Sequence, residues 1–241
     1  WTSSAKSGFQ FDVQGSVAKS THAGLPWLQR IRTEVGDKLH VWPFDGWQVP
    51  EGKSVIAEVY PSIFRNRYSR EERSVDQQDA YCVARWLAET DRQGFLDQYF
   101  LSPLSRTSAL QVYAASDREE PSRIMSPACT AGKRRNWCRK EVAEWLIEQA
   151  RKDITFIAGI DHGFSFPINY FERYKLKSWE HFMDDFCEHW PTDEDRTHVD
   201  SIRKHQDGPP DRTGSNKDFR LTEKWTSSAK SVFQFDVQGS V

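Results

Sequence analysis

The sequence lacks the features of a membrane-spanning, disulfide-rich or zinc-binding protein. No apolar run approaches the ~20 residues that a helix needs to cross a bilayer, and the opening WTSSAKS does not resemble a signal peptide. Only four cysteines occur and none form a CxxC pair, which argues against a zinc knuckle or a thioredoxin-type motif. We therefore expect free thiols, a reducing cytoplasmic location and no membrane partner.

The chain also lacks a strong charge of one sign. Lys and Arg total 33 and Asp and Glu total 35, which gives a formal net charge of -2. Such a balance creates no global attraction to nucleic acid or to an anionic membrane. Any site for a polyanion must therefore be local, or must be built with bound metal ions.

What the chain does have is a repeat at its two ends. Residues 1–17 read WTSSAKSGFQFDVQGSV and residues 225–241 read WTSSAKSVFQFDVQGSV, so that only Gly8 and Val232 differ. Two copies at opposite ends are unlike a solenoid, which stacks many neighbouring units. We interpret the chain as a circularly permuted domain. The alternative is an assembly or circular-template product that is not a stable protein.

Both copies of the repeat carry the alternating pattern of a strand, and one position in a sheet can accept only one of them. The N-terminal copy runs directly into a predicted helix. We therefore expect residues 7–13 to enter the sheet and the C-terminal copy to be displaced or frayed.

Hydrophobic periodicity predicts an α/β domain, compatible with three layers built on a mixed sheet. The predicted strands are residues 7–13, 39–44, 54–60, 110–115 and 154–160. The predicted helices are residues 21–35, 76–89, 137–151 and 179–189. The polar residues 191–224 are predicted to form a long solvated excursion.

Three local patterns refine these elements. Pro26 is expected only in the first turn of its helix, because proline lacks a backbone donor. Ser74 and Gln77 have the spacing of a capping box, which should start the helix over residues 76–89. The β-branched run over residues 154–160 is typical of a strand that is covered on both faces.

Acidic residues fall at the ends of the predicted elements. Asp117 and Asp161 each follow a strand, and Glu58 lies within one. Asp76 and Asp79 lie in the first turns of a helix, where residues three apart share a face. Ligands of α/β sheets bind outside the carboxyl ends of strands. Clustered carboxylates need a counter-charge, and Mg²⁺ or Mn²⁺, which prefer oxygen ligands, would supply it.

The same acidic residues also have simpler interpretations. The helix dipole favours acidic residues in a first turn, which accounts for Asp76 well and for Asp79 in part. Asp161 precedes Gly163 closely and can shape a turn. Glu58 is harder to explain, because it interrupts the apolar run VIAEVY. Spacing alone slightly favours these structural roles.

Five segments together resemble a domain-of-unknown-function family of predicted nucleases with an RNase H-like fold. They are AGIDHGFSFP (158–167), KSVFQFDVQGSVAKSTHAGLPWL (230–241 resumed at 18–28), VWPFDGW (41–47), AEVYPS (57–62) and DQQDAY (76–81). The family has these segments in this order along one chain, whereas here the order is rotated. Residues 1–105 resemble the family's C-terminal half, residues 110–224 its N-terminal half, and residues 225–241 duplicate residues 1–17.

The resemblance implies a single RNase H-like domain over residues 1–241, with an acidic site gathered from three strands and the last helix. In this chain the catalytic and metal-binding residues would be Asp117, Asp161, Glu58 and Asp79, with Asp76 as an auxiliary metal ligand. The implied function is a metal-dependent nuclease or phosphodiesterase that uses Mg²⁺ or Mn²⁺. The alternative is a non-catalytic nucleic-acid or nucleotide-binding module of the same fold.

Basic residues provide candidate contacts to the nucleic-acid backbone. Lys19 lies in GSVAKST near a predicted helix start and can hold one phosphate. The glycines of a phosphate-binding loop are absent there, and an N-cap role for Ser20 or Thr21 is the simpler interpretation. Arg65 and Arg67 begin a local basic patch with two further arginines. That patch fits phosphate contact and an ordinary solvated face equally well.

The sequence GFSFP over residues 163–167 indicates an aromatic-lined turn beside the acidic site. His162 can orient a water molecule or act as a general base, although packing is the commoner role of a lone histidine. Phe164 and Phe166 can stack on a base, and core packing is again the simpler interpretation.

Overall fold

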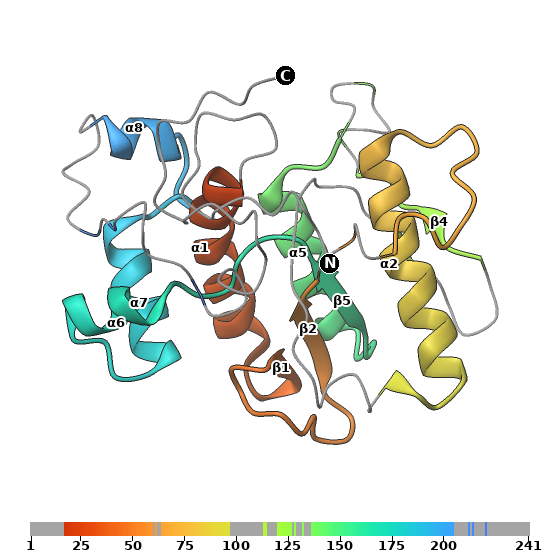
Figure 1. Cartoon of the computed structure of the whole chain (residues 1–241), viewed down its shortest axis with the longest axis horizontal. Coiled ribbons are helices and arrows are strands. Elements are labelled where there is room, and N and C mark those ends of the chain that lie inside the picture. The colour runs from red at the N-terminus through yellow and green to blue at the C-terminus, as the bar shows by residue number, and fades with distance from the viewer. Residues whose placement is uncertain are drawn as a thin grey trace. The chain divides into compact units, whose positions relative to one another are not determined.

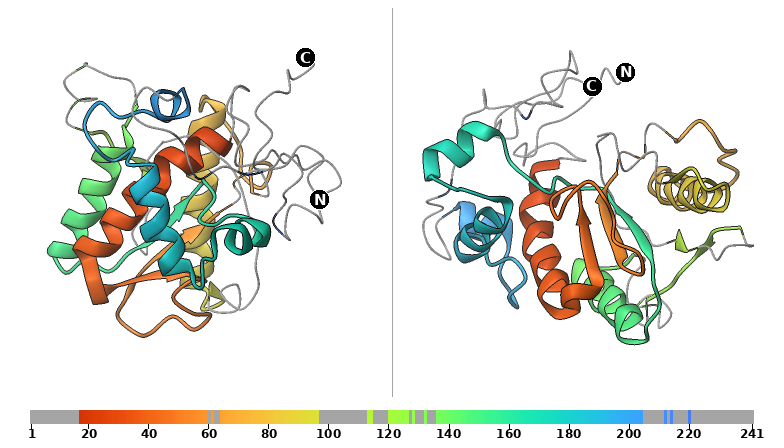
Figure 2. Two further views of the ribbon diagram at one scale, coloured as in Figure 1. Left: turned by 90° about the vertical axis from the view of Figure 1, so that its left-hand side faces the viewer. Right: turned by 90° about the horizontal axis from the view of Figure 1, so that it is seen from below.

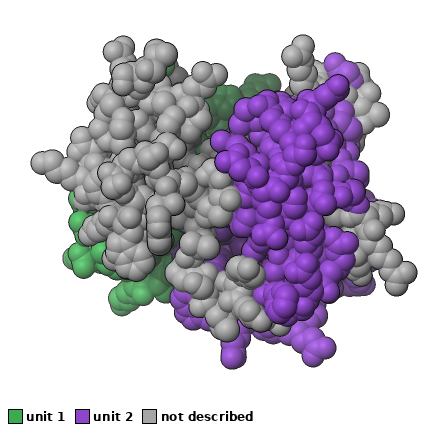
Figure 3. Space-filling model, turned by 45° about the vertical axis from the view of Figure 1, so that its right-hand side comes forward, with its two compact units in different colours: residues 1–30, 162–241 green, residues 31–161 purple. Residues whose placement is uncertain are grey.

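The computed structural model describes residues 17–59, 61, 64–96, 113–114, 120–126, 128, 132, 136–204, 212, 214 and 220. The predicted strand over residues 7–13, its C-terminal copy and Asp117 lie outside these residues. The chain divides into two compact units (Figure 3). Unit 1 comprises residues 1–30 and 162–241, and unit 2 comprises residues 31–161. The single domain over residues 1–241 stays a prediction.

Unit 2 contains a parallel sheet in the order β1-β2-β5. Its strands are β1 (Leu39–Trp42), β2 (Ser54–Glu58) and β5 (Ile157–Ile160) (Figure 1). A short 3₁₀ helix, η1 (Gly36–Lys38), precedes β1. All three strands were predicted, although each is shorter than its apolar pattern. β1 ends where Pro43, which has no backbone N–H, follows it.

The last strand of this sheet is less covered than its sequence indicates. β5 was expected to be buried on both faces, but all four of its residues are half-buried. The physical reason is its position at the edge of the described sheet, where β5 pairs with β2 alone. A β-branched apolar run therefore does not by itself distinguish a central strand from an edge strand.

A second ladder in unit 2 is antiparallel and separate from the parallel sheet. It joins β3 (Tyr113–Ala114) to β4 (Ser122–Arg123), with Tyr113 opposite Arg123. The strand predicted over residues 110–115 is confirmed at these two positions, and its other residues lie outside the described part of the chain. The α/β class holds, but among the described residues the parallel and antiparallel strands do not form one mixed sheet.

Two long helices of unit 2 lie on different sides of its strands (Figure 2). These are α2 (Val75–Arg92) and α5 (Arg139–Arg151). The predicted capping box is confirmed, because Gln77 N donates to Ser74 Oγ at 3.2 Å and Ser74 N donates to Gln77 Oε1 at 2.9 Å. Trp137 was expected inside the second helix. It lies before α5, and its indole donates to Ile124 O at 2.7 Å.

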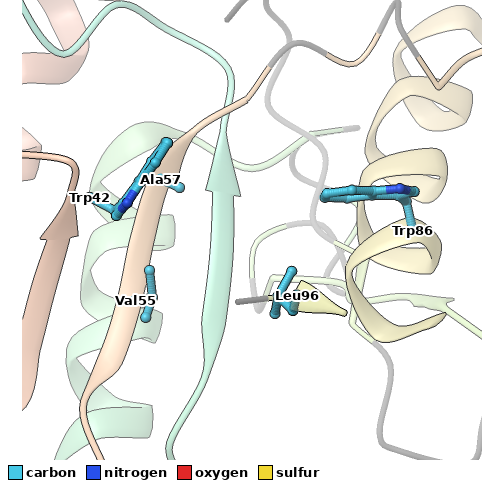
Figure 4. Close-up of a cluster of buried hydrophobic side chains, with 5 residues drawn as sticks. All are labelled: Trp42, Val55, Ala57, Trp86 and Leu96. Carbon is cyan, nitrogen blue, oxygen red and sulfur yellow. The ribbon is translucent and has the colours of Figure 1, made fainter. Parts of the chain in front are cut away.

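Unit 2 is held together by an apolar cluster that joins the sheet to α2 (Figure 4). Its buried members are Trp42, Val55, Ala57, Trp86 and Leu96. Gly159 of β5 allows close packing, because a Cβ atom added there would lie 2.7 Å from Val83 Cγ1 of α2. The absence of a side chain thus brings this helix onto the strand.

Helix α1 (Val17–Val35) corrects two predictions about its start. It begins four residues earlier than expected, and Pro26 lies inside it, not in its first turn. Proline at this position removes the donor for the carbonyl four residues before it, that of His22. Thr192 supplies the missing donor, since its hydroxyl donates to His22 O at 2.8 Å. A side chain of unit 1 therefore makes the interior proline tolerable.

The remaining helices all belong to unit 1. They are α6 (Ile168–Tyr174), α7 (Trp179–His189) and α8 (Val199–Arg203). Helix α7 was predicted, and Ser178 caps it by accepting a hydrogen bond from His181 N. Helix α6 was not predicted. Helix α8 lies within residues 191–224, which were predicted to form a solvated excursion. That prediction is wrong at this helix, because Val199 and Ile202 are buried.

Aromatic rings form the core of unit 1. Phe166 contacts the rings of Tyr170, Phe182 and Phe186 at centroid distances of 4.7, 5.1 and 5.2 Å. Phe164 and Phe166 are both buried. The core-packing interpretation of these two residues is confirmed, and neither ring faces solvent to stack on a base. No helix of the described part of the chain is long and apolar enough to cross a membrane.

Candidate functional site

Two of the predicted ligands lie at the carboxyl ends of neighbouring parallel strands in unit 2. Glu58 is the last residue of β2 and is paired in register with Ile160, the last residue of β5. Asp161 follows Ile160 directly. Parallel pairing therefore brings these two acidic positions to one edge of the sheet, as the sequence predicted. Both residues are half-buried.

Helix α2 brings a third acidic residue toward the same edge. Figures 1 and 4 show α2 running antiparallel to β5, and Val83 of α2 packs on Gly159. Asp79 precedes Val83 by one helical turn and shares its face. It therefore lies toward the carboxyl end of β5. We name Glu58, Asp161 and Asp79 the acidic edge.

The three residues share an edge, but the Glu58 side chain does not point to the face of the sheet on which Asp79 lies. Val55 and Ala57 belong to the cluster that includes Trp86 of α2. Successive side chains point to opposite faces of a strand, so Glu58 faces away from α2 while Asp79 lies on it. Among the described residues, no three His, Cys, Asp or Glu side chains are grouped closely enough to hold a metal ion.

Asp79 forms an ion pair with Arg65, a residue that the sequence analysis predicted to contact the nucleic-acid backbone. Arg65 Nε donates to Asp79 Oδ1 at 2.5 Å, and Arg65 Nη2 forms a second bond to Oδ2. The Asp79 side chain is 8% exposed and the Arg65 side chain 43%. Removing one partner of a fully buried pair costs about 3–5 kcal/mol. The cost here is smaller, because water reaches the guanidinium.

The auxiliary ligand of the prediction has a different environment. Asp76 is exposed in the first turn of α2, where a negative charge is favoured by the helix dipole. Asp79 lies three residues further on and is buried. The shared helix face expected from their spacing therefore does not give the two carboxylates the same surroundings.

Lys19 and its neighbours lie in the first turns of α1, and the contact of Lys19 with a phosphate stays a prediction. Lys19 lies inside α1 and pairs with Asp200 at 2.8 Å. Ser20 and Thr21 are also helical, so neither is the N-cap. The hydroxyl of Thr21 instead accepts a hydrogen bond from Gly163 N at 3.0 Å. These side chains stabilise unit 1.

The basic patch before α2 has an inner and an outer part. Arg73 is largely buried and lies 3.7 Å from the Tyr81 ring centroid, and Arg65 holds Asp79. Arg67 is exposed beside the Tyr68 ring. Arg70 is also exposed, and its Nε donates to Arg73 O at 2.7 Å. Arg73 and Arg65 therefore contact α2, while Arg65, Arg67 and Arg70 are exposed.

His162 is a packing residue of unit 1. Its ring is buried and Nδ1 donates to Gly163 O at 3.0 Å. A Cβ atom added at Gly24 would lie 2.9 Å from His162 Cε1 and closer still to Nε2. The ring therefore fills the space that this glycine leaves in α1. The packing interpretation of His162 is confirmed.

Sequence reasoning did not identify the Arg65–Asp79 pair. The two residues are separated by a loop whose path no periodicity predicts, and each was assigned to another ligand. The available signal was the spacing of Asp79, which lies one helical turn before the apolar Val83, because a charge on the buried side of a helix requires a nearby partner.

Comparison with protein-family models, with curated proteins and with solved structures finds no match for this chain. The family resemblance and the RNase H-like fold therefore stay predictions.

Proposed function

We propose that this chain is a metal-dependent nuclease or phosphodiesterase of RNase H-like fold, in circularly permuted order, that acts on nucleic acid in the cytoplasm. The observation that carries the proposal is the acidic edge. Glu58 and Asp161 end paired parallel strands, and α2 brings Asp79 toward them. Carboxylates from separate elements at the carboxyl edge of a sheet are placed where α/β proteins bind ligands.

The donor set suits Mg²⁺ or Mn²⁺, with one condition. Carboxylate oxygens are the ligands that these hard cations prefer. Asp161 and Asp79 would hold the ion, Glu58 would join them only by turning toward α2, and Asp117 lies outside the described residues. A bound ion would supply an activated water and a stabilised leaving oxygen. The condition is that Arg65 gives up Asp79 and that the carboxylates draw together, since among the described residues they are not grouped closely enough to hold a metal ion.

Metal titration and cleavage assays on matched variants test the proposal. We expect Asp161→Asn to weaken Mn²⁺ binding about 10-fold or more and to reduce cleavage about 100-fold, because one ligand loses its charge. Asp153→Asn is the control. It removes an exposed carboxylate that pairs with Lys38 before the amino end of β5. Calorimetry and assays on single-stranded and branched DNA and RNA provide the measurements.

A non-catalytic nucleic-acid or nucleotide-binding module is the second candidate, and the Arg65–Asp79 pair favours it. An arginine that satisfies both oxygens of the aspartate performs the charge compensation that a metal would otherwise provide. Binding of nucleic acid that persists in EDTA, without cleavage and without a response to Asp161→Asn, would support the module and contradict the nuclease.

A further inference from the structure

The loop before α2, residues 64–73, is fixed by its contacts with that helix. Gln78 Nε2 donates to Tyr68 O at 2.8 Å. The ring of Phe64 stacks on Trp86 of α2 at a centroid distance of 4.6 Å. A loop with these attachments holds its outward-facing side chains in place before any ligand arrives, which reduces the entropy that binding would cost.

Arg67 is positioned by an aromatic ring of this loop. Its guanidinium lies over Tyr68, 5.8 Å from the ring centroid. That ring is fixed in turn, because Tyr68 OH donates to Glu89 at 2.6 Å and the Arg85 guanidinium lies 4.8 Å from the same centroid. An arginine that lies over a ring keeps the N–H donors at the edge of its guanidinium available for an oxyanion.

Arg70 is the second outward-facing arginine of the loop. Its Nε donates to Arg73 O at 2.7 Å, which fixes the side chain and leaves the two terminal nitrogens to make other contacts. Arg67 and Arg70 are both exposed. Among the described residues neither forms an ion pair with a carboxylate, whereas Arg65, Arg73 and Arg85 each do. The loop therefore carries two positive charges that no described side chain neutralises.

We propose that Arg67 and Arg70 bind phosphate groups of the nucleic-acid backbone without a metal ion. The proposal rests on the function proposed above only in its choice of partner. An arginine presents a planar fork of donors that matches two oxygens of one phosphate. Glu72 follows the pair, is exposed and offsets one positive charge, so the interaction is confined to the two arginine forks.

Binding of a labelled single-stranded DNA in EDTA, measured by fluorescence anisotropy over a range of salt concentrations, tests the proposal. Each phosphate contact to a single strand contributes about −0.7 to the slope of log K against log salt. We expect Arg67→Gln/Arg70→Gln to reduce the magnitude of this slope by about 1.4 and to weaken binding about 10-fold at physiological salt.

Two further double variants separate position and geometry from charge. Arg92→Gln/Arg151→Gln removes the same charge from exposed arginines in the last turns of α2 and α5, and it should bind like the unaltered chain. Arg67→Lys/Arg70→Lys keeps both charges, so the slope should remain. Lysine lacks the planar fork, so this variant should bind about 3-fold more weakly.

The outcomes distinguish this proposal from the function on which it rests. If Arg67→Gln/Arg70→Gln shows the slope and affinity of the control variant, the two arginines form a solvated face and the proposal is wrong. Absence of DNA binding in EDTA also overturns it. Cleavage in Mn²⁺ judges the nuclease separately. Cleavage with an unchanged slope would keep the nuclease and reject the phosphate contacts, and the expected slope without cleavage would do the reverse.

Discussion

His22 is the residue whose burial has the clearest consequence for stability. It is fully buried in unit 1, 4.4 Å from the Trp190 ring centroid, and its Nδ1 donates to Ala18 O at 3.0 Å. Desolvation lowers the pKa of this imidazole from 6.5 to about 3, against the opposing effect of the hydrogen bond. The folded protein therefore keeps His22 neutral at a pH where the unfolded chain would protonate it.

The sign of the pH dependence follows from this lowered pKa. Above pH 6.5 the folded and unfolded states both hold neutral His22, and its full contribution to stability is present. Between pH 6.5 and about 3 the unfolded state binds the additional proton. The free energy of unfolding should then fall by about 1.4 kcal/mol per pH unit from this group.

Urea unfolding between pH 7 and pH 4 measures the contribution of His22. His22→Leu should be less stable at pH 7 but should lose less stability on acidification. His181→Gln, which removes an exposed histidine of the same unit, should keep the original slope. An unchanged slope in His22→Leu would mean that this imidazole is not the group responsible.

The acidic residues show what can be predicted at the scale of single side chains. The sequence placed Glu58, Asp161 and Asp79 at one edge, because strand ends and helix starts can be recognised from periodicity. It did not predict that Glu58 faces away from α2, which depends on which face of β2 the helix covers. It also did not predict the partner of Asp79, because that contact depends on a loop.

At the scale of elements, interior Pro26 connects α1 to a residue far away in the sequence. The carbonyl of His22 has no helical donor and depends on the Thr192 hydroxyl. Thr192→Val keeps the shape and removes this donor. Because an unsatisfied buried carbonyl costs about 1–3 kcal/mol, we expect the free energy of unfolding to fall by that amount.

A double-mutant cycle isolates the role of proline in this prediction. In Pro26→Ala the restored backbone N–H can donate to His22 O, so Thr192→Val should cost about 1 kcal/mol less in that background. The measurement is chemical unfolding of the four variants at pH 7. Equal costs in the two backgrounds would show that Thr192 acts through packing alone.

Elements were predictable where a local signal was strong. The capping residues Ser74 and Gln77 located the start of α2, and the periodicity of residues 179–189 located α7. Helix α8 was missed because its two buried residues, Val199 and Ile202, stand within a strongly polar stretch. Their burial comes from tertiary packing, which overrides local composition in so short an element.

At the scale of the molecule, the two copies of the terminal repeat compete for one strand position. Which copy enters the sheet stays a prediction, because both strand patterns lie outside the described residues. Helix α1 begins at Val17, directly after the strand pattern of the N-terminal copy. A strand over residues 7–13 would therefore connect to α1 by a short loop, of the kind that joins neighbouring elements in α/β proteins.

Removing each copy in turn tests which one the folded protein uses. We expect a chain of residues 1–224 to keep the thermal midpoint of the full chain, because its N-terminal copy still supplies the strand. A chain of residues 17–241 must take the strand from the distant copy and bear a longer loop closure, so its midpoint should fall by about 5 °C or more. Differential scanning calorimetry of both chains gives the comparison. A stable 17–241 chain beside a destabilised 1–224 chain would place the C-terminal copy in the sheet, and equal stability would show that neither copy is specifically required.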